Sequence, residues 1–245
     1  MKYLIIGASS GLGKELAKKF AEERNDLVII SRDIRDLNAI KSDLEMKHSI
    51  NIDVLALDFS SLDEIDNKLF SNQKLLENLD GVLFPIGMMF KEDNLNLKTE
   101  NLKKLINANF ISIAHTIQKL KENLIKKKNS CIIGFGSVSG FLGRGINVTY
   151  AGAKRGLESY FESMAFDKDL KNTNIQFYTL GYLETNLSFG KDLKFPKSSV
   201  IKLSNIVYKN KNSKFLKTYY PIYWILVHLI IKIIPFFILR KFDIK

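Results

Sequence analysis

Two side chains of the sequence are spaced for proton transfer. Tyr150 and Lys154 stand four residues apart, in the run Tyr150-Ala151-Gly152-Ala153-Lys154. On a helix, residues four apart lie on one face, one turn above the other. A free phenol has a pKa of about 10, which suits proton transfer near neutral pH poorly. Because a neighbouring ammonium favours the phenolate, the pair predicts a phenol whose pKa is lowered toward neutrality.

A serine hydroxyl is placed to complete this pair. Ser137 stands thirteen residues before Tyr150, soon after the apolar run Cys131–Phe135. Its hydroxyl can hold a substrate oxygen beside the phenol. A Tyr-x-x-x-Lys pair alone arises often on helices and indicates little. It gains meaning in combination with the serine and with a glycine-rich segment near the N-terminus.

That glycine-rich segment is typical of a nucleotide-binding turn. It lies between an apolar run and an amphipathic stretch, in the sequence Gly7-Ala8-Ser9-Ser10-Gly11-Leu12-Gly13. Glycine lets the backbone turn tightly and approach a pyrophosphate, and the amides and dipole of the following helix attract the anion. This strand–turn–helix context favours a dinucleotide site over a plain turn. The residues expected to bind the cofactor here are Gly7, Ser9, Ser10, Gly11, Leu12 and Gly13.

The end of the second apolar run bears on the choice of cofactor. An acid at that point accepts hydrogen bonds from the ribose hydroxyls of NAD, whereas an arginine can bind the 2′-phosphate of NADP. Ser31 occupies the place expected for the acid, and Arg32 follows it. Asp33 is expected at the start of the next helix, where an acid suits the dipole. The sequence therefore predicts NADP(H).

Short apolar runs alternate with longer amphipathic stretches along most of the chain. Strands buried on both faces are expected at Tyr3–Ile6, Leu27–Ile30, Ile52–Leu57, Gly81–Phe84, Cys131–Phe135 and Ile175–Leu180. Helices are expected near 12–24, 33–47, 62–77, 99–126 and 151–170. This alternation predicts a single α/β domain with a doubly wound parallel sheet, a Rossmann fold, and a ligand crevice at the carboxyl ends of the strands.

In combination, these motifs resemble those of the short-chain dehydrogenase/reductase family, over about residues 1–187. Asn109, in Asn107-Ala108-Asn109, is similar to the asparagine of the family's catalytic tetrad. The resemblance implies that Tyr150 exchanges the substrate proton and that Ser137 orients the carbonyl. It also implies that Lys154 tunes the tyrosine and binds the nicotinamide ribose, with Asn109 holding a water that links Lys154 to solvent.

The resemblance extends to three further cofactor-binding positions, with two departures from the family pattern. Asp58 is similar to the aspartate that meets the adenine ring. The family's Asn-Asn-Ala-Gly run is here Phe84-Pro85-Ile86-Gly87, which keeps only Gly87, so the support that the asparagine gives the strand must be rebuilt. The family's Pro-Gly is here Leu180-Gly181, and Thr185 beyond it is expected to touch the nicotinamide amide.

Composition excludes several other classes of protein. The 245 residues are 46% apolar and 26% charged, which is ordinary for one folded domain. The single cysteine, Cys131, provides no disulfide framework and indicates a reducing cytoplasm. No signal-peptide pattern opens the chain, and no nucleic-acid motif occurs in it. His48, His115 and His228 lack metal-ligand spacing, so no metal site is expected.

The C-terminal part of the chain is basic and apolar. Residues 191–245 carry twelve Lys or Arg and two acids, whereas the rest of the chain is nearly neutral. Residues 186–198 are expected to form a substrate lid with Phe189, Lys191, Lys194, Phe195 and Lys197, and Arg144 is expected near the same mouth.

The apolar run 219–239 is interrupted by Pro221, His228, Lys232 and Pro235. It predicts a helix in the interface of an anionic membrane, with Tyr219, Tyr220, Tyr223 and Trp224 at headgroup depth. A helix packed into the core or a dimer interface is the alternative.

These patterns predict three segments of one domain and leave three functions open. A dinucleotide-binding and catalytic region spans 1–185, a lid with the last helix and strand spans 186–218, and an interfacial segment spans 219–245. The favoured function is an NADP(H)-dependent carbonyl reductase at the inner face of a membrane, acting on a lipid-borne ketone. The tail resembles that of family members that reduce keto-sugars on polyprenyl phosphates. The alternatives are a 3-oxoacyl-(acyl-carrier-protein) reductase and a non-catalytic NADP-binding protein. Pairing of the helices near 99–126 and 151–170 could form a homodimer or homotetramer.

Overall fold

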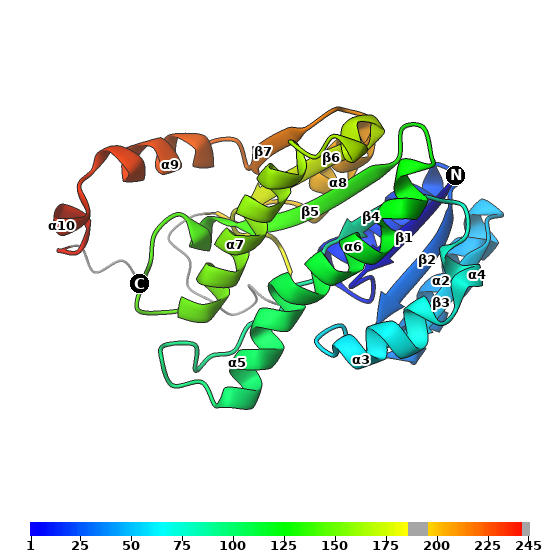
Figure 1. The fold of residues 1–245 in the computed structure, drawn as a ribbon, viewed down its shortest axis with the longest axis horizontal. Helices are drawn as coiled ribbons and strands as arrows, with labels where there is room; N and C mark the ends of the chain where they lie inside the picture. The colour runs from blue at the N-terminus through cyan, green and yellow to red at the C-terminus, as the bar shows by residue number, and fades with distance from the viewer. Residues whose placement is uncertain (186–195, 242–245) are drawn as a thin grey trace.

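A seven-stranded parallel sheet forms the centre of the molecule (Figure 1). The computed structural model describes residues 1–185 and 196–241. The strand order is β3-β2-β1-β4-β5-β6-β7, so the chain winds outward in both directions from β1. The strands are β1 (Lys2–Ile6), β2 (Asp26–Ser31), β3 (Ile52–Ala56), β4 (Leu79–Phe84), β5 (Cys131–Ser137), β6 (Asn174–Leu180) and β7 (Leu216–Tyr220). The predicted doubly wound parallel sheet is confirmed.

Helices cover both faces of this sheet, because alternate residues of each strand point to opposite sides. Tyr3 and Ile5 pack in one buried cluster with α1, α2 and α8, whereas Leu4 and Ile6 pack in a second cluster with α6 and α7. The strand residues in both clusters are almost fully buried. The helices are α1 (Gly11–Glu22), α2 (Ile34–His48), α3 (Leu62–Glu64), α4 (Gln73–Leu76), α5 (Thr99–Ile106), α6 (Ser112–Ile125), α7 (Val148–Met164), α8 (Val200–Asn210), α9 (Trp224–Ile233) and α10 (Phe236–Leu239).

Three of the predicted helices are wrong in their extent, and one of them, 99–126, is interrupted by the π-helical segment Asn107–Ile111 between α5 and α6. The stretch 62–77 is not one helix, because a π-helical segment, Ile65–Phe70, separates α3 from α4. The hydroxyl of Ser71 donates to the carbonyl of Asp66 in this segment, an interaction that periodicity does not reveal. The helix expected at 151–170 begins at Val148 and ends at Met164, so Tyr150 lies in its first turn.

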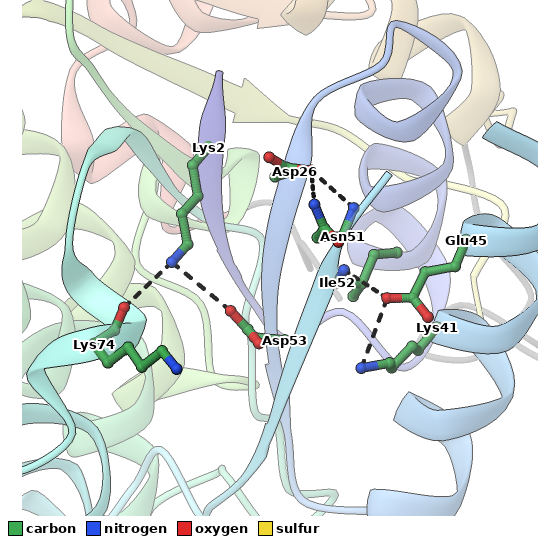
Figure 2. Close-up of polar contacts among 8 residues, drawn as sticks. All are labelled: Lys2, Asp26, Lys41, Glu45, Asn51, Ile52, Asp53 and Lys74. Carbon is green, nitrogen blue, oxygen red and sulfur yellow. Dashed lines mark hydrogen bonds and ion pairs between the residues drawn. The ribbon is translucent and has the colours of Figure 1, made fainter. Parts of the chain in front are cut away.

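Polar side chains form hydrogen bonds and an ion pair at the amino ends of the first three strands (Figure 2). The carboxylate of Asp26, at the start of β2, accepts a hydrogen bond from the backbone N–H of Asn51 at 2.8 Å. The carboxylate of Glu45, on α2, accepts one from the N–H of Ile52 at 2.8 Å. The ammonium of Lys2 lies 3.7 Å from the carboxylate of Asp53. These contacts stabilise the edge of the sheet opposite to the one where ligands are expected.

The C-terminal segment forms an arm that leaves the body of the molecule (Figure 1). Strand β7 extends to Tyr220, so Tyr219 and Tyr220 belong to the sheet, and their prediction as headgroup anchors is wrong. Trp224 is also inside the protein, with 5% of its surface exposed. Helices α9 and α10 follow, separated by a break before Pro235. Among the described residues, no helix has the length and hydropathy needed to cross a bilayer.

Candidate active site

Ser137 and Tyr150 meet at the carboxyl end of the sheet. Ser137 is the last residue of β5, and Tyr150 is the third residue of α7. A side-chain hydrogen bond joins the two hydroxyl groups. The Oγ atom of Ser137 also accepts a hydrogen bond from the N–H of Ser139 at 3.1 Å, which fixes its rotamer. The predicted convergence of these two groups is present in the structure.

The environment of Tyr150 raises the pKa of its phenol. Burial disfavours the phenolate, and the hydrogen bond from Ser137 opposes this effect only in part. The spacing of Tyr150 and Lys154 predicts a lowered pKa for the phenol. As far as the groups of the protein are concerned, this prediction is wrong. The ammonium of Lys154 lies 5.9 Å from the centre of the Tyr150 ring, and its hydrogen bonds go elsewhere.

Lys154 is buried behind the tyrosine, with 3% of its surface exposed. Its Nζ atom donates to the backbone carbonyl of Phe135 at 3.0 Å and to that of Ile86 at 3.3 Å. Burial lowers the pKa of this amine to about 8, because two neutral carbonyls do not replace the hydration of a charge. The amine can therefore exchange a proton in the mildly alkaline range.

Asn109 supports the loop that follows β4. The residue is fully buried in a π-helical segment, Asn107–Ile111. Its amide nitrogen donates to the carbonyls of Met88 and Leu105 at 2.8 and 2.9 Å, and its oxygen accepts from the N–H of Met88 at 3.2 Å. These contacts tie the loop after β4 to the helical segment that carries Asn109. The water that Asn109 is expected to hold stays a prediction.

Asp93, in the same loop, is a residue that sequence reasoning missed. Its carboxylate is buried and accepts hydrogen bonds from the backbone N–H groups of Thr149 and Tyr150 at 2.9 and 2.8 Å. Its own carbonyl accepts from the N–H of Val148 at 3.1 Å. More than fifty positions separate the partners, so no local pattern in the sequence points to this contact.

The glycine-rich turn has the backbone geometry that the cofactor prediction requires. Gly7 and Gly11 have φ angles of +96° and +51°, a region that side chains disfavour. A Cβ atom on Gly13 would overlap the carbonyl oxygen of Gly7, so only glycine allows α1 to pack this closely on β1. Ser10 begins α1 without capping it through its side chain, which leaves the first amides of the helix facing the turn.

Thr185 lies beside this turn, and its expected contact with the nicotinamide amide stays a prediction. Its methyl carbon is 3.1 Å from the position that a Cβ atom on Gly11 would take. Gly87 lies on the other side, next to the amide of Asn109. Of the remaining predicted residues of the turn, Ser9 and Ser10 are at least partly exposed, whereas the side chain of Leu12 is buried in the core. Leu12 can therefore face a cofactor only through its backbone.

Arg32 and Asp58 follow β2 and β3 at the adenosine end of the predicted site. Arg32 is exposed, and no hydrogen bond or ion pair of its side chain occurs within the described residues. Asp33 caps α2 by accepting from the N–H of Arg35 at 2.9 Å, which confirms its predicted place at a helix start. Asp58 accepts hydrogen bonds from the N–H and hydroxyl of Ser60 at 2.9 and 2.8 Å, so its carboxylate orders its own loop.

The rim of the site joins the C-terminal arm. Arg144 donates to the hydroxyl of Ser139 at 3.1 Å, two residues from Ser137. The ring of Phe141 lies 4.2 Å from that of His228 on α9 and 6.3 Å from that of Trp224. The arm therefore packs on the segment that follows Ser137. Lys197 is exposed, and the other predicted lid residues, Phe189, Lys191, Lys194 and Phe195, lie outside the described residues.

Comparison with known proteins decides the family. The model of the short chain dehydrogenase family matches residues 2–192, more than three quarters of the chain. The chain belongs to the short-chain dehydrogenase family. It is accordingly an oxidoreductase with a nicotinamide dinucleotide as cofactor, and the sheet-edge cluster of Ser137, Tyr150 and Lys154 is the family's candidate active site in this chain.

Among the relatives of this short-chain dehydrogenase are two named 3-oxoacyl reductases. A 3-oxoacyl-(acyl-carrier-protein) reductase of Buchnera aphidicola is 28% identical, over 75% of this chain and 74% of its own length. A very-long-chain 3-oxoacyl-CoA reductase of Podospora anserina is 28% identical, over 89% of this chain and 66% of its own length. A solved short-chain dehydrogenase of Sphingobium yanoikuyae, in complex with NADPH, shares the fold at a TM-score of 0.79 and 21% identity, covering 90% of this chain and 87% of its own.

Proposed function

We propose that this short-chain dehydrogenase is an NADP(H)-dependent carbonyl reductase that acts on an amphiphilic, lipid-borne ketone. The observation that carries the proposal is the hydrogen-bonded pair of Ser137 and Tyr150, placed at the carboxyl edge of the sheet with Lys154 buried behind it. Binding of a cofactor without catalysis does not require a phenol and an amine in this arrangement. Both groups are retained here.

The residues around the glycine-rich turn fit a dinucleotide phosphate. The tight turn of Gly7 and Gly11 leaves room for a pyrophosphate at the N-terminus of α1. The exposed guanidinium of Arg32, which follows β2, suits the 2′-phosphate that distinguishes NADP from NAD. Bound there, the cofactor supplies the hydride. The relative of known structure that binds NADPH agrees with this choice.

The chain's own residues supply orientation and the proton. The hydroxyl of Ser137 holds the carbonyl oxygen of the substrate, and the phenol of Tyr150 donates a proton to that oxygen. Because burial raises the pKa of Tyr150, the phenol is protonated at neutral pH, and this favours reduction over oxidation there. Lys154, with a pKa of about 8, lies 5.9 Å from the centre of the Tyr150 ring, so it would return a proton to the phenol only through an intervening group.

The C-terminal arm supports an amphiphilic substrate. Its outward face is apolar, with Leu226, Ile230 and Ile233 exposed by 64, 56 and 80% and two phenylalanines of α10 exposed by about as much. Lys232, Arg240 and Lys241 are exposed on the same arm. An apolar face flanked by cations suits an anionic bilayer surface, at roughly 1 kcal/mol per well-placed cation. A polyprenyl-phosphate-linked keto-sugar is one substrate of this kind.

The remaining parts of the proposal concern the segments and their location. Residues 186–218 would include the lid, and 219–245 would rest on the inner face of a membrane, with the protein on its cytoplasmic side. Strand β7 ends at Tyr220, so the first two residues of the segment 219–245 belong to the sheet. Pairing through α6 and α7 into a homodimer or homotetramer stays a prediction.

A 3-oxoacyl thioester is the second candidate substrate. Two relatives carry that activity in their names, one acting on a carrier protein and one on very-long-chain acyl-CoA. The basic C-terminal part of the chain would attract an acidic carrier electrostatically.

Turnover of matched ketones tests these candidates. We expect NADPH to be oxidised faster with 2-tridecanone in lipid vesicles than with acetoacetyl-CoA in solution, and NADH to replace NADPH poorly. A higher rate with acetoacetyl-CoA would favour the thioester.

Tyr150→Phe should lower kcat by about 100-fold or more while leaving NADPH affinity intact. Tyr160→Phe, on the same helix, is the control and should keep the wild-type rate. Equal rates in both variants would overturn the mechanism.

A further inference from the structure

The helix that carries the catalytic tyrosine begins without a cap of its own. Asn147 precedes α7 in the left-handed region, at a φ of 55°, and its side chain makes no capping hydrogen bond. The first N–H groups of any helix have no acceptor within the helix, and they need one from elsewhere when they are not in water. In α7 these are the amides of Val148, Thr149 and Tyr150.

A single residue from a distant loop accepts all three. The carbonyl of Asp93 binds the N–H of Val148, and its two carboxylate oxygens bind those of Thr149 and Tyr150, at 2.8–3.1 Å. Asp93 is 2% exposed, so water does not compete for these contacts. The carboxylate also lies at the positive end of the helix dipole, where a negative charge is favoured.

The loop that holds Asp93 is itself fixed to the active site at two other points. This loop spans 85–98, between β4 and α5. Asn109 binds Met88 through both polar atoms of its amide, and Lys154 donates to the carbonyl of Ile86. Asp93 therefore connects α7 to a segment whose position is set by two other residues of the catalytic tetrad.

We propose that Asp93 is a positioning residue for Tyr150. One of its carboxylate oxygens binds the backbone N–H of Tyr150 itself, at 2.8 Å, and so fixes the Cα atom from which the phenol projects. Without it, the first turn of α7 would fray and the phenol would leave Ser137 for part of the time. This inference rests on the proposed role of Tyr150 as the proton donor. A displacement of about 1 Å at a reacting group can cost about 100-fold in rate.

Asp93→Ala should therefore lower kcat by about 10- to 100-fold, with a smaller change in the KM for NADPH. Asp93→Asn should fall between this variant and the wild type, because its amide oxygen can still accept one of the two N–H groups. The probes are NADPH with 2-tridecanone or acetoacetyl-CoA. Independently of turnover, the amides of residues 148–151 should exchange hydrogen faster in both variants. If Asp93→Ala does not fold, Asp93→Asn carries both measurements.

Asp26→Ala is the matched control, because Asp26 also accepts a backbone N–H from a distant segment but lies at the opposite edge of the sheet (Figure 2). It should lower stability without changing kcat or the exchange of residues 148–151. Wild-type kcat and exchange in a folded Asp93 variant would overturn the inference.

A double variant separates this inference from the proposed function. If Asp93 acts through Tyr150, then Asp93→Ala should add little to the loss caused by Tyr150→Phe. A further 10- to 100-fold loss in the Tyr150→Phe background would refute the positioning role. Full activity of Tyr150→Phe alone would instead refute the proposed mechanism.

Discussion

At the scale of single residues, burial controls the chemistry of the site more than charge pairing does. Tyr150 and Lys154 share one face of α7, as their spacing predicts, yet the ammonium binds two backbone carbonyls and does not contact the phenol. The same apolar surroundings therefore shift the two pKa values in opposite directions, raising that of the phenol and lowering that of the amine below it. Spacing identifies which groups meet, but the pKa depends on solvent access, which spacing does not report.

The buried amine of Lys154 makes a testable contribution to stability. Below pH 8 the amine is charged in both the folded and the unfolded protein. The whole free-energy cost of burying this charge then lowers the stability of the folded state. Between pH 8 and the unfolded value of 10.5 the folded protein has lost this proton and the unfolded one keeps it, so stability rises with pH. At about 1.4 kcal/mol per pKa unit, the rise is roughly 3 kcal/mol.

We therefore expect the wild type to gain stability relative to Lys154→Met as the pH rises from 7 to 10.5. Urea unfolding of both proteins at several pH values measures this difference. Lys103→Met, on the exposed surface of α5, controls for the loss of any lysine. Parallel pH curves for the wild type and Lys154→Met would show that the amine is not buried as described.

At the scale of elements, local patterns predict most of the fold and half of the site. The apolar runs and the glycine-rich turn depend on residues close in sequence, so β1, α1 and the Ser137–Tyr150 pair are predictable. Two features depend on distant contacts instead. Asp93 caps a helix more than fifty residues away, and Asn109 binds the loop that follows β4 from twenty-one residues away. Apolar periodicity also does not reveal that Trp224 is buried in space left by the missing side chain of a glycine in another segment.

That glycine, Gly181, is what allows α9 to pack on the body. A Cβ atom at this position would overlap the indole nitrogen of Trp224. Trp224 is the single tryptophan of the chain, so its fluorescence reports the packing of α9 directly. Gly181→Ala should shift the emission to longer wavelength, because the indole must move toward water, and should cost about 1–3 kcal/mol of stability. Gly143→Ala is the control, since no described atom lies within 4 Å of its Cβ position. Unchanged emission in Gly181→Ala would mean that the arm packs elsewhere.

At the scale of the whole molecule, helix α9 of the arm exposes an apolar face, whereas a surface helix usually turns its apolar face toward the core. Leu226, Ile230 and Ile233 lie on one face of α9 and point away from the protein, while Trp224 and His228 hold the other face on the rim of the site. No other part of residues 1–185 and 196–241 covers this apolar face. Burial in the core, one of the alternatives for the tail, is therefore excluded for these three residues. A bilayer surface or a second copy of the chain can still cover it.

A membrane surface and a second copy lead to different results. With vesicles containing anionic lipid, we expect the wild type to sediment, and more weakly at high salt because exposed charges are screened. Replacing Leu226, Ile230 and Ile233 by serine should abolish sedimentation and leave Trp224 emission unchanged. The control replaces Met46, Leu95 and Phe166, which are exposed by 84–87% on other surfaces, and should sediment like the wild type. If the arm variant instead changes from a dimer to a monomer by light scattering, with no vesicle binding in the wild type, the apolar face joins two copies and the membrane proposal fails.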